Sequence, residues 1–226
     1  MERLLFSVVM MLAAMPAVAQ QVPVPIVSAE EAQGQIPNGA SIEGRVDGDL
    51  NGDGEIDTAF VWRSTEGPDE ERGLKVLVAY RAEFDLGHDP IGEATLDPFP
   101  QGPGTLLIRK GVLIFEDLTG GTTATQSTRR YRYDAKQRKM RLIGIDAQRY
   151  SRTNSHGTVK ISWNLLDGTQ IVERGEPNTS GKGNEAQIYA KPERTLHKTT
   201  PVWMEDAPDP DSLIDAEIVP EGEDRD

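Results

Sequence analysis

Residues 49–57 read DLNGDGEID and lead directly into the apolar stretch TAFVW at 58–62. Oxygen-bearing side chains alternate along the first part of this segment, at Asp49, Asn51 and Asp53. A tight turn can bring alternate side chains to one point, and calcium takes about 6–8 oxygen ligands in irregular geometry. The segment therefore predicts a calcium loop that pins the start of a strand.

The predicted ligands are oxygen atoms of five residues: Asp49, Asn51, Asp53, Glu55 and Asp57. Glu55 would contribute its backbone carbonyl, and Asp57 would bind directly or through a water molecule. Gly54 stands where the chain has to bend sharply, because glycine accepts a positive φ at low cost. The alternative is a metal-free turn, since Asp and Asn side chains also accept hydrogen bonds from their own backbone.

The spacing D-x-N-x-D-G-x-x-D before a strand resembles the FG-GAP-type calcium loop of integrin-like β-propeller blades, over about residues 44–62. The chain holds one copy of this motif, whereas a propeller needs several blades, so a full propeller is not expected. The order of GDLNGDG, IRKGVLIF, YRYD, RLIG and NLLDG also resembles a group of uncharacterised secreted bacterial proteins, which implies no activity. The FG-GAP resemblance implies calcium ligands at Asp49, Asn51, Asp53 and Asp57.

The remaining pattern predicts strands. Residues 58–63 are apolar on both faces and rich in β-branched and aromatic side chains, which predicts a central strand. Tight turns are expected at Lys110-Gly111 and Asp167-Gly168, and a longer turn over 134–139. Short strands at this spacing indicate a single all-β antiparallel domain, arranged as a barrel, meander or sandwich. The other expected strands are 41–46, 73–81, 105–109, 112–116, 128–133, 140–145, 159–165, 169–174 and 186–190. An acidic exposed loop is expected at 64–72.

The N-terminal residues predict export. Arg3 precedes an apolar run at 4–14, and Ala17-Val18-Ala19 is a small-x-small cleavage pattern. We therefore expect a periplasmic or secreted chain that begins at Gln20 and has no transmembrane segment; an uncleaved signal anchor is the alternative. The expected segments are a signal peptide at 1–19, an extended lead-in at 20–38, a β domain at 39–204 and an acidic disordered tail at 205–226.

Composition limits how such a chain can be stabilised. The 226 residues include no cysteine, so packing or a metal has to take the place of disulfides.

Ser28 with Glu31 three residues later forms a capping-box pattern, which predicts one helical turn in the lead-in. Residues 205–226 carry ten acids and one arginine, a composition typical of disorder.

Charge is unevenly distributed along the chain. The net charge of −13 argues against nucleic-acid binding. Residues 129–152 nevertheless hold nine basic residues and two acids, a net charge of +7. One hypothesis is a surface for a protein, glycan or lipid-headgroup partner that the acidic tail competes for; the alternative is a solvated hairpin and a solubilising tail. Tyr131 and Tyr133 alternate with these arginines and are expected to face the core.

Residues 84–104 are rich in proline and glycine and predict a long irregular loop. His88-Asp89 lies in it, which makes an envelope hydrolase the alternative function. No serine or cysteine elbow motif accompanies the pair. The favoured hypothesis is therefore a non-catalytic, secreted or periplasmic calcium-binding β protein, with Ca2+ in a structural role and no catalytic residues.

Overall fold

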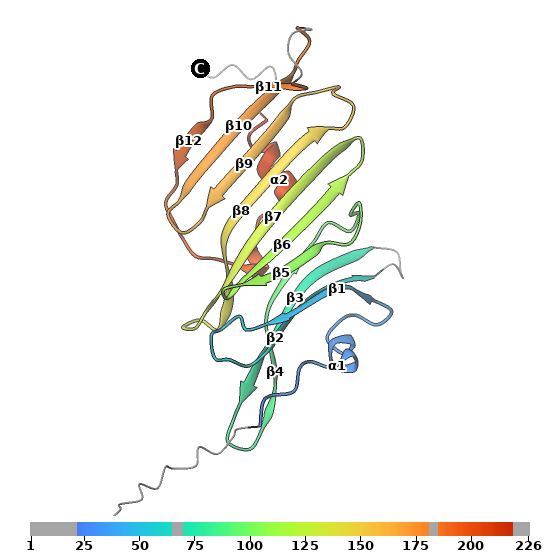
Figure 1. The fold of residues 1–226 in the computed structure, drawn as a ribbon, viewed down its shortest axis with the longest axis vertical. Coiled ribbons are helices and arrows are strands. Elements are labelled where there is room, and N and C mark those ends of the chain that lie inside the picture. Colours follow the sequence, from blue (N-terminus) through green and yellow to red (C-terminus); the bar gives the residue numbers. More distant parts are fainter. Residues whose placement is uncertain (1–21, 65–69, 181–184, 219–226) are drawn as a thin grey trace, which may run out of the picture.

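The computed structural model describes residues 22–64, 70–180 and 185–218, and the predicted signal peptide at 1–19 lies outside them. The strands are β1 (Ser41–Gly48), β2 (Asp57–Ser64), β3 (Glu71–Arg81), β4 (Leu86–Thr95), β5 (Thr105–Arg109), β6 (Val112–Gly120), β7 (Thr123–Asp134), β8 (Lys139–Ser151), β9 (Thr158–Asn164), β10 (Thr169–Pro177), β11 (Gln187–Tyr189), β12 (Glu193–Leu196) and β13 (Val202–Trp203). They form two antiparallel sheets (Figure 1). The all-β antiparallel prediction is confirmed.

Both sheets follow the order of the chain. Sheet A runs β1-β2-β3-β4, and sheet B runs β11-β10-β9-β8-β7-β6-β5, with β12 beside β10 and β13 beside β8. The two sheets approach each other at β1 and β5, where Gly48 lies against Ile108. Of the arrangements considered from the sequence, the meander describes each sheet, and neither closes into a barrel over the described residues.

β2 is the central strand that the sequence predicts. It pairs with β1 on one side and β3 on the other, and Ala59, Phe60 and Val61 are completely buried. Ala59 and Val61 face sheet B, whereas Phe60 and Trp62 face the N-terminal lead-in. Both faces of β2 are covered, which explains why its sequence has no polar side.

The main core fills the space between the sheets. From sheet A it takes Val61 and Leu74, and from sheet B it takes Phe115, Tyr131 and Leu142, all completely buried. Burying such a side chain contributes about 1.5–3 kcal/mol before entropy is counted. The face of sheet B that carries these residues is its inner face; the opposite face is its outer face.

A short helix, α1 (Ala29–Gln33), covers the other side of sheet A. Ser28 caps it, because its hydroxyl accepts a 3.0 Å hydrogen bond from the Glu31 backbone N–H, as the capping-box pattern predicts. Val27, Ala32 and Ile36 pack against Phe60, Trp62 and Leu77. The lead-in is therefore a structural layer of the domain.

Two predictions about loops are wrong in part. Residues 86–95 of the predicted irregular loop form β4, the edge strand of sheet A, and an edge tolerates Pro90 because its missing N–H costs no ladder bond there. Arg72, assigned to an exposed loop at 64–72, lies in β3 with 1% of its surface exposed. Residues 65–69 of that loop lie outside the described part of the chain.

The C-terminal segment is more ordered than its composition suggests. A 3₁₀ turn (Met204–Asp206) and α2 (Pro210–Asp215) pack on the inner face of sheet B, and Met204 and Ile214 are completely buried. Figure 1 shows α2 behind β7, β8 and β9, with the outer face toward the viewer. Within the predicted tail, residues 205–218 are thus part of the fold, and 219–226 lie outside the described residues.

The hairpin turns follow the sequence. Lys110 and Gly111 have φ values of 52° and 70°, which suits the tight turn between β5 and β6. Gly168 has a φ of 79° in the turn between β9 and β10. Neither α1 nor α2, the two α-helices in the described ranges, offers the run of apolar residues that crossing a membrane requires.

Candidate metal centre

The predicted calcium loop, residues 49–57, connects β1 to β2. Gly52 and Gly54 have φ values of 84° and 85°, in the left-handed region that favours glycine. No atom lies within 4 Å of where a Cβ would be at either position, so backbone conformation and not space requires glycine there. The sharp bend predicted at Gly54 is confirmed.

Side chains in the first half of the loop fold back onto its own backbone. Asp49 accepts hydrogen bonds from the N–H groups of Gly52 (2.6 Å) and Gly54 (3.1 Å). Asn51 accepts one from the Asp53 N–H at 2.9 Å, and Asp53 accepts one from the Glu55 N–H at 2.8 Å. These bonds hold three oxygen-bearing side chains along one turn, an arrangement that serves a metal-bound loop and a metal-free Asx turn alike.

Asp57 points the other way, into the protein. It is completely buried, and it accepts hydrogen bonds from the backbone N–H of Leu50 at 2.7 Å and of Ala79 at 3.0 Å. Burial raises the pKa of Asp57, the two hydrogen bonds oppose the rise, and the charges of Asp53 and Asp49 add to it. The buried carboxylate therefore lies close enough to the loop's other aspartates to feel their repulsion.

The side chain of Glu55 leaves the loop. One carboxylate oxygen lies 2.5 Å from Arg81 Nη2, and the other accepts a 2.8 Å hydrogen bond from the Val24 N–H. The hydrogen bond from Arg81 lowers the pKa of Glu55. These contacts turn the Glu55 side chain away from the loop's other acids and tie the loop to the N-terminal lead-in.

The donor set suits calcium, but the carboxylates do not converge as they stand. Over the described ranges, no group of three or more Asp, Glu, His or Cys side chains is arranged to hold a metal. Asp57 points inward, and the Glu55 side chain points toward Arg81. No Lys, Arg or His of the described chain forms an ion pair with Asp49, Asp53 or Asp57, so three carboxylates share one loop without a basic partner.

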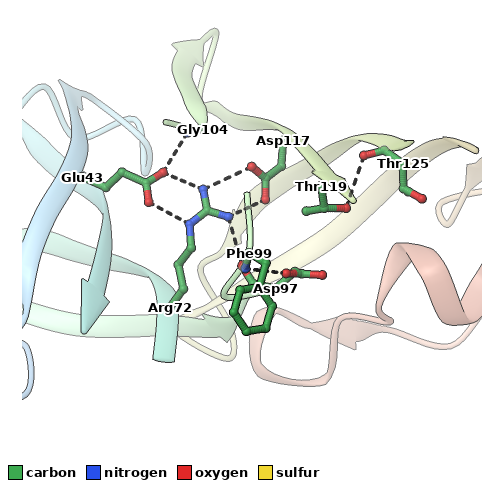
Figure 2. Close-up of polar contacts among 8 residues, drawn as sticks. All are labelled: Glu43, Arg72, Asp97, Phe99, Gly104, Asp117, Thr119 and Thr125. Atoms are coloured by element: carbon green, nitrogen blue, oxygen red, sulfur yellow. Dashed lines mark hydrogen bonds and ion pairs between the residues drawn. The ribbon is translucent and has the colours of Figure 1, made fainter. Parts of the chain in front are cut away.

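A residue that sequence reasoning missed joins the two sheets. Arg72 of β3 contacts Asp117 of β6 at 2.6 Å and Glu43 of β1 at 2.6 Å, as Figure 2 shows. The Gly104 N–H donates a further hydrogen bond to Glu43. Burial alone would lower the pKa of Arg72, but the two carboxylates raise it above its ordinary value. This buried group is structural, and only its distant partners could have revealed it.

The residues of the alternative hydrolase site do not meet. His88 is 2.7 Å from Glu31 of α1, whereas Asp89 is 2.7 Å from Arg138. Successive residues of a strand point to opposite faces, and both lie in β4. The structure therefore gives His88 and Asp89 separate partners and no shared site.

Much of the basic segment 129–152 is paired within the fold. The acids of the C-terminal segment supply several partners: Asp211 and Asp215 lie 2.6 and 2.5 Å from Arg149, and Glu205 contacts Lys139. Further pairs are Arg130 with Asp146 and Arg138 with Asp89. The acidic segment thus meets the basic one as part of the packed domain.

Comparison with protein-family models, with curated proteins and with solved structures gives no match. The functional argument therefore starts from the residues of the loop and their geometry.

Proposed function

We propose that this protein is a non-catalytic β protein of the periplasm or the extracellular space, in which the loop 49–57 binds one structural calcium ion. The supporting observation is the set of Asp49, Asp53 and Asp57, which lie in one loop without a basic partner among the described residues. Hard oxygen donors of this kind suit calcium. A divalent cation would offset the repulsion that helps to raise the pKa of Asp57.

The proposed ligands are the side chains of Asp49, Asn51 and Asp53, the Glu55 carbonyl, and Asp57 directly or through a water molecule. Asp57 is already bonded to β3 through the Ala79 N–H. An ion bound here would therefore link the loop to the two middle strands of sheet A. With three carboxylates we expect a Kd on the order of 10⁻⁴ M, as in extracellular modules.

The proposal is tested by melting the mature chain in EDTA and in about 1 mM calcium. At that Kd, calcium adds about 1.4 kcal/mol by mass action. For a domain of this size we expect an increase in Tm of about 3–6 °C. Asp53→Asn should abolish the increase, and Asp134→Asn is the matched control, because Asp134 also caps backbone N–H groups in a turn. Equal melting with and without calcium would refute the proposal.

The proposal of export rests on residues 1–19. Mass spectrometry of the protein recovered from the periplasm or the medium should give a chain that begins at Gln20. Recovery of the full-length chain in the cell membrane would favour the uncleaved signal anchor.

We also propose where a partner would meet the basic segment. Arg132 and Arg141 face each other across β7 and β8, and neither has an ion-pair partner in the described chain. Like charges directly opposite destabilise a sheet, so an anionic group of a protein, glycan or lipid would be favoured there. Arg132→Met should weaken salt-sensitive retention on heparin. Unchanged retention would refute the proposal that an anionic partner binds here.

A further inference from the structure

β7 carries three successive polar side chains on its inner face. Ser127, Arg129 and Tyr131 have exposed fractions of 4%, 4% and 0%. The residues opposite Arg129 on the neighbouring strands are Phe115 and Ile145, which are apolar and completely buried. The Arg129 side chain therefore enters the core between two hydroxyl-bearing residues.

Two buried polar atoms of this group lack partners. Arg129 Nε and Tyr131 Oη are buried without a hydrogen bond, and Ser127 Oγ has none to any described residue. Across the described ranges no carboxylate lies within ion-pair distance of Arg129. A buried cation without a counter-charge is strongly unfavourable, so this arrangement calls for an acceptor.

Arg72 is a buried arginine of the same fold whose positive charge is balanced by carboxylates. It is 1% exposed, compared with 4% for Arg129, and it contacts the carboxylates of Glu43 and Asp117. Asp117 lies directly across from Ser127, but Arg72 engages both of its oxygens, at 2.6 and 3.1 Å. The nearby carboxylate is therefore already committed to another cation.

Arg129 and Tyr131 are neighbours on the inner face of β7, two residues apart. Burial raises the pKa of Tyr131, and the positive charge of Arg129 and its nearby N–H donors oppose that rise. The guanidinium thus lies near the phenol, although no hydrogen bond of standard geometry joins the two groups. Both groups are left with N–H or O–H donors that need an acceptor.

We propose that Ser127, Arg129 and Tyr131 form a binding site for a small oxyanion, a carboxylate or a phosphate, on the inner face of β7. The guanidinium fork matches the two oxygens of such a group and would neutralise its charge. The Tyr131 hydroxyl supplies a second donor, and Ser127 adds a hydroxyl on the same face. Since only a few per cent of these side chains is exposed, the ligand is a small anion or the end group of a larger molecule.

The test is calorimetric titration of the mature chain with sodium acetate and with sodium phosphate in a low-salt buffer. Wild type and Arg109→Met should bind one of these anions saturably, with a matching rise in Tm. Arg129→Met should bind at least ten-fold more weakly. Arg109 is the matched control, because it carries the same charge but lies exposed at the end of β5, outside the basic segment 129–152. Equal binding by Arg129→Met, or no binding of either anion by wild type, would overturn the proposal.

A second measurement separates an anion site from a structural role of Arg129. In buffer free of oxyanions, Arg129→Met should melt at or above wild type, because it removes an uncompensated buried charge. A lower Tm, or a loss of the folded state, would overturn the proposal by showing that the charge is already compensated within the fold. Tyr131→Phe should keep the fold and weaken anion binding several-fold.

Discussion

The Asp57 carboxylate accepts a 3.0 Å hydrogen bond from the backbone N–H of Ala79, which joins the last acid of the loop 49–57 to β3. Its second oxygen accepts a 2.7 Å bond from the Leu50 N–H. One side chain thus fixes both the closure of the loop and its position on sheet A. The same side chain is buried without a cation partner in the described chain, which makes its charge costly.

Asp57→Asn should destabilise the protein even without calcium. The carboxylate accepts both N–H groups with its two oxygens, whereas the amide has only one oxygen. The amide NH₂ would therefore face the N–H of Leu50 or Ala79, and two donors cannot form a hydrogen bond. Leaving one buried N–H unsatisfied costs about 1–3 kcal/mol, measurable by urea unfolding in EDTA. Asp53→Asn is the control and should change stability by less than about 0.5 kcal/mol, because its oxygen can still accept from the Glu55 N–H. Equal stability of wild type and Asp57→Asn would contradict this role.

Calcium affinity should fall as the solution is acidified. The pKa of Asp57 is raised above its ordinary value of 3.8, so the folded protein binds this proton more tightly than the unfolded chain does. Without calcium, the contribution of Asp57 to stability is therefore lost as pH rises from the unfolded pKa through the raised folded pKa. With calcium, the proton and the ion compete. Titrations at pH 7 and at about pH 5 should show weaker binding at the lower pH, and identical affinities would argue against Asp57 as a ligand.

Arg72→Met should be among the most damaging single changes. It would leave the carboxylates of Glu43 and Asp117 buried without their cation. Removing one partner of a buried ion pair costs about 3–5 kcal/mol, which urea unfolding can measure. Combining Arg72→Met with Glu43→Gln and Asp117→Asn should restore part of the lost stability, because no buried charge is then left unpaired. A loss below about 1 kcal/mol for Arg72→Met would show that the sheets do not depend on this contact.

Ile214→Ala should show that α2 is part of the domain. Ile214 is completely buried against Ala147, Ile161 and Val172. Truncating such a side chain costs about 2–5 kcal/mol. Ile218→Ala is the matched control, because 46% of Ile218 is exposed, and it should cost less than about 0.5 kcal/mol. Similar small losses for both variants would mean that α2 contributes little to the fold.

Local patterns explain what the sequence predicted correctly. Residues 58–63 are apolar on both faces, and the structure buries β2 on both. Lys110-Gly111 and Asp167-Gly168 carry turn chemistry that needs no distant partner, and both turns are where they were expected. The bend at Gly54 was predictable for the same reason, because its positive φ is a local requirement.

Non-local contacts explain what the sequence did not reveal. Glu43 lies 29 residues from Arg72 and Asp117 lies 45 residues away, so only the folded sheets show that Arg72 is buried. Pro90 and the glycines around it led to the prediction of an irregular loop instead of β4. The strand forms because it pairs with β3 along its length. In the C-terminal segment, the ten acids led to the prediction of disorder, although a few apolar residues there pack α2 against sheet B.

The most direct test of the calcium proposal is calorimetric titration of calcium into the mature, EDTA-treated chain. We predict one ion per chain with a Kd on the order of 10⁻⁴ M, lost in Asp53→Asn and retained in Asp134→Asn. An absence of saturable heat in the wild type at millimolar calcium would contradict the proposal and leave residues 49–57 as a metal-free turn.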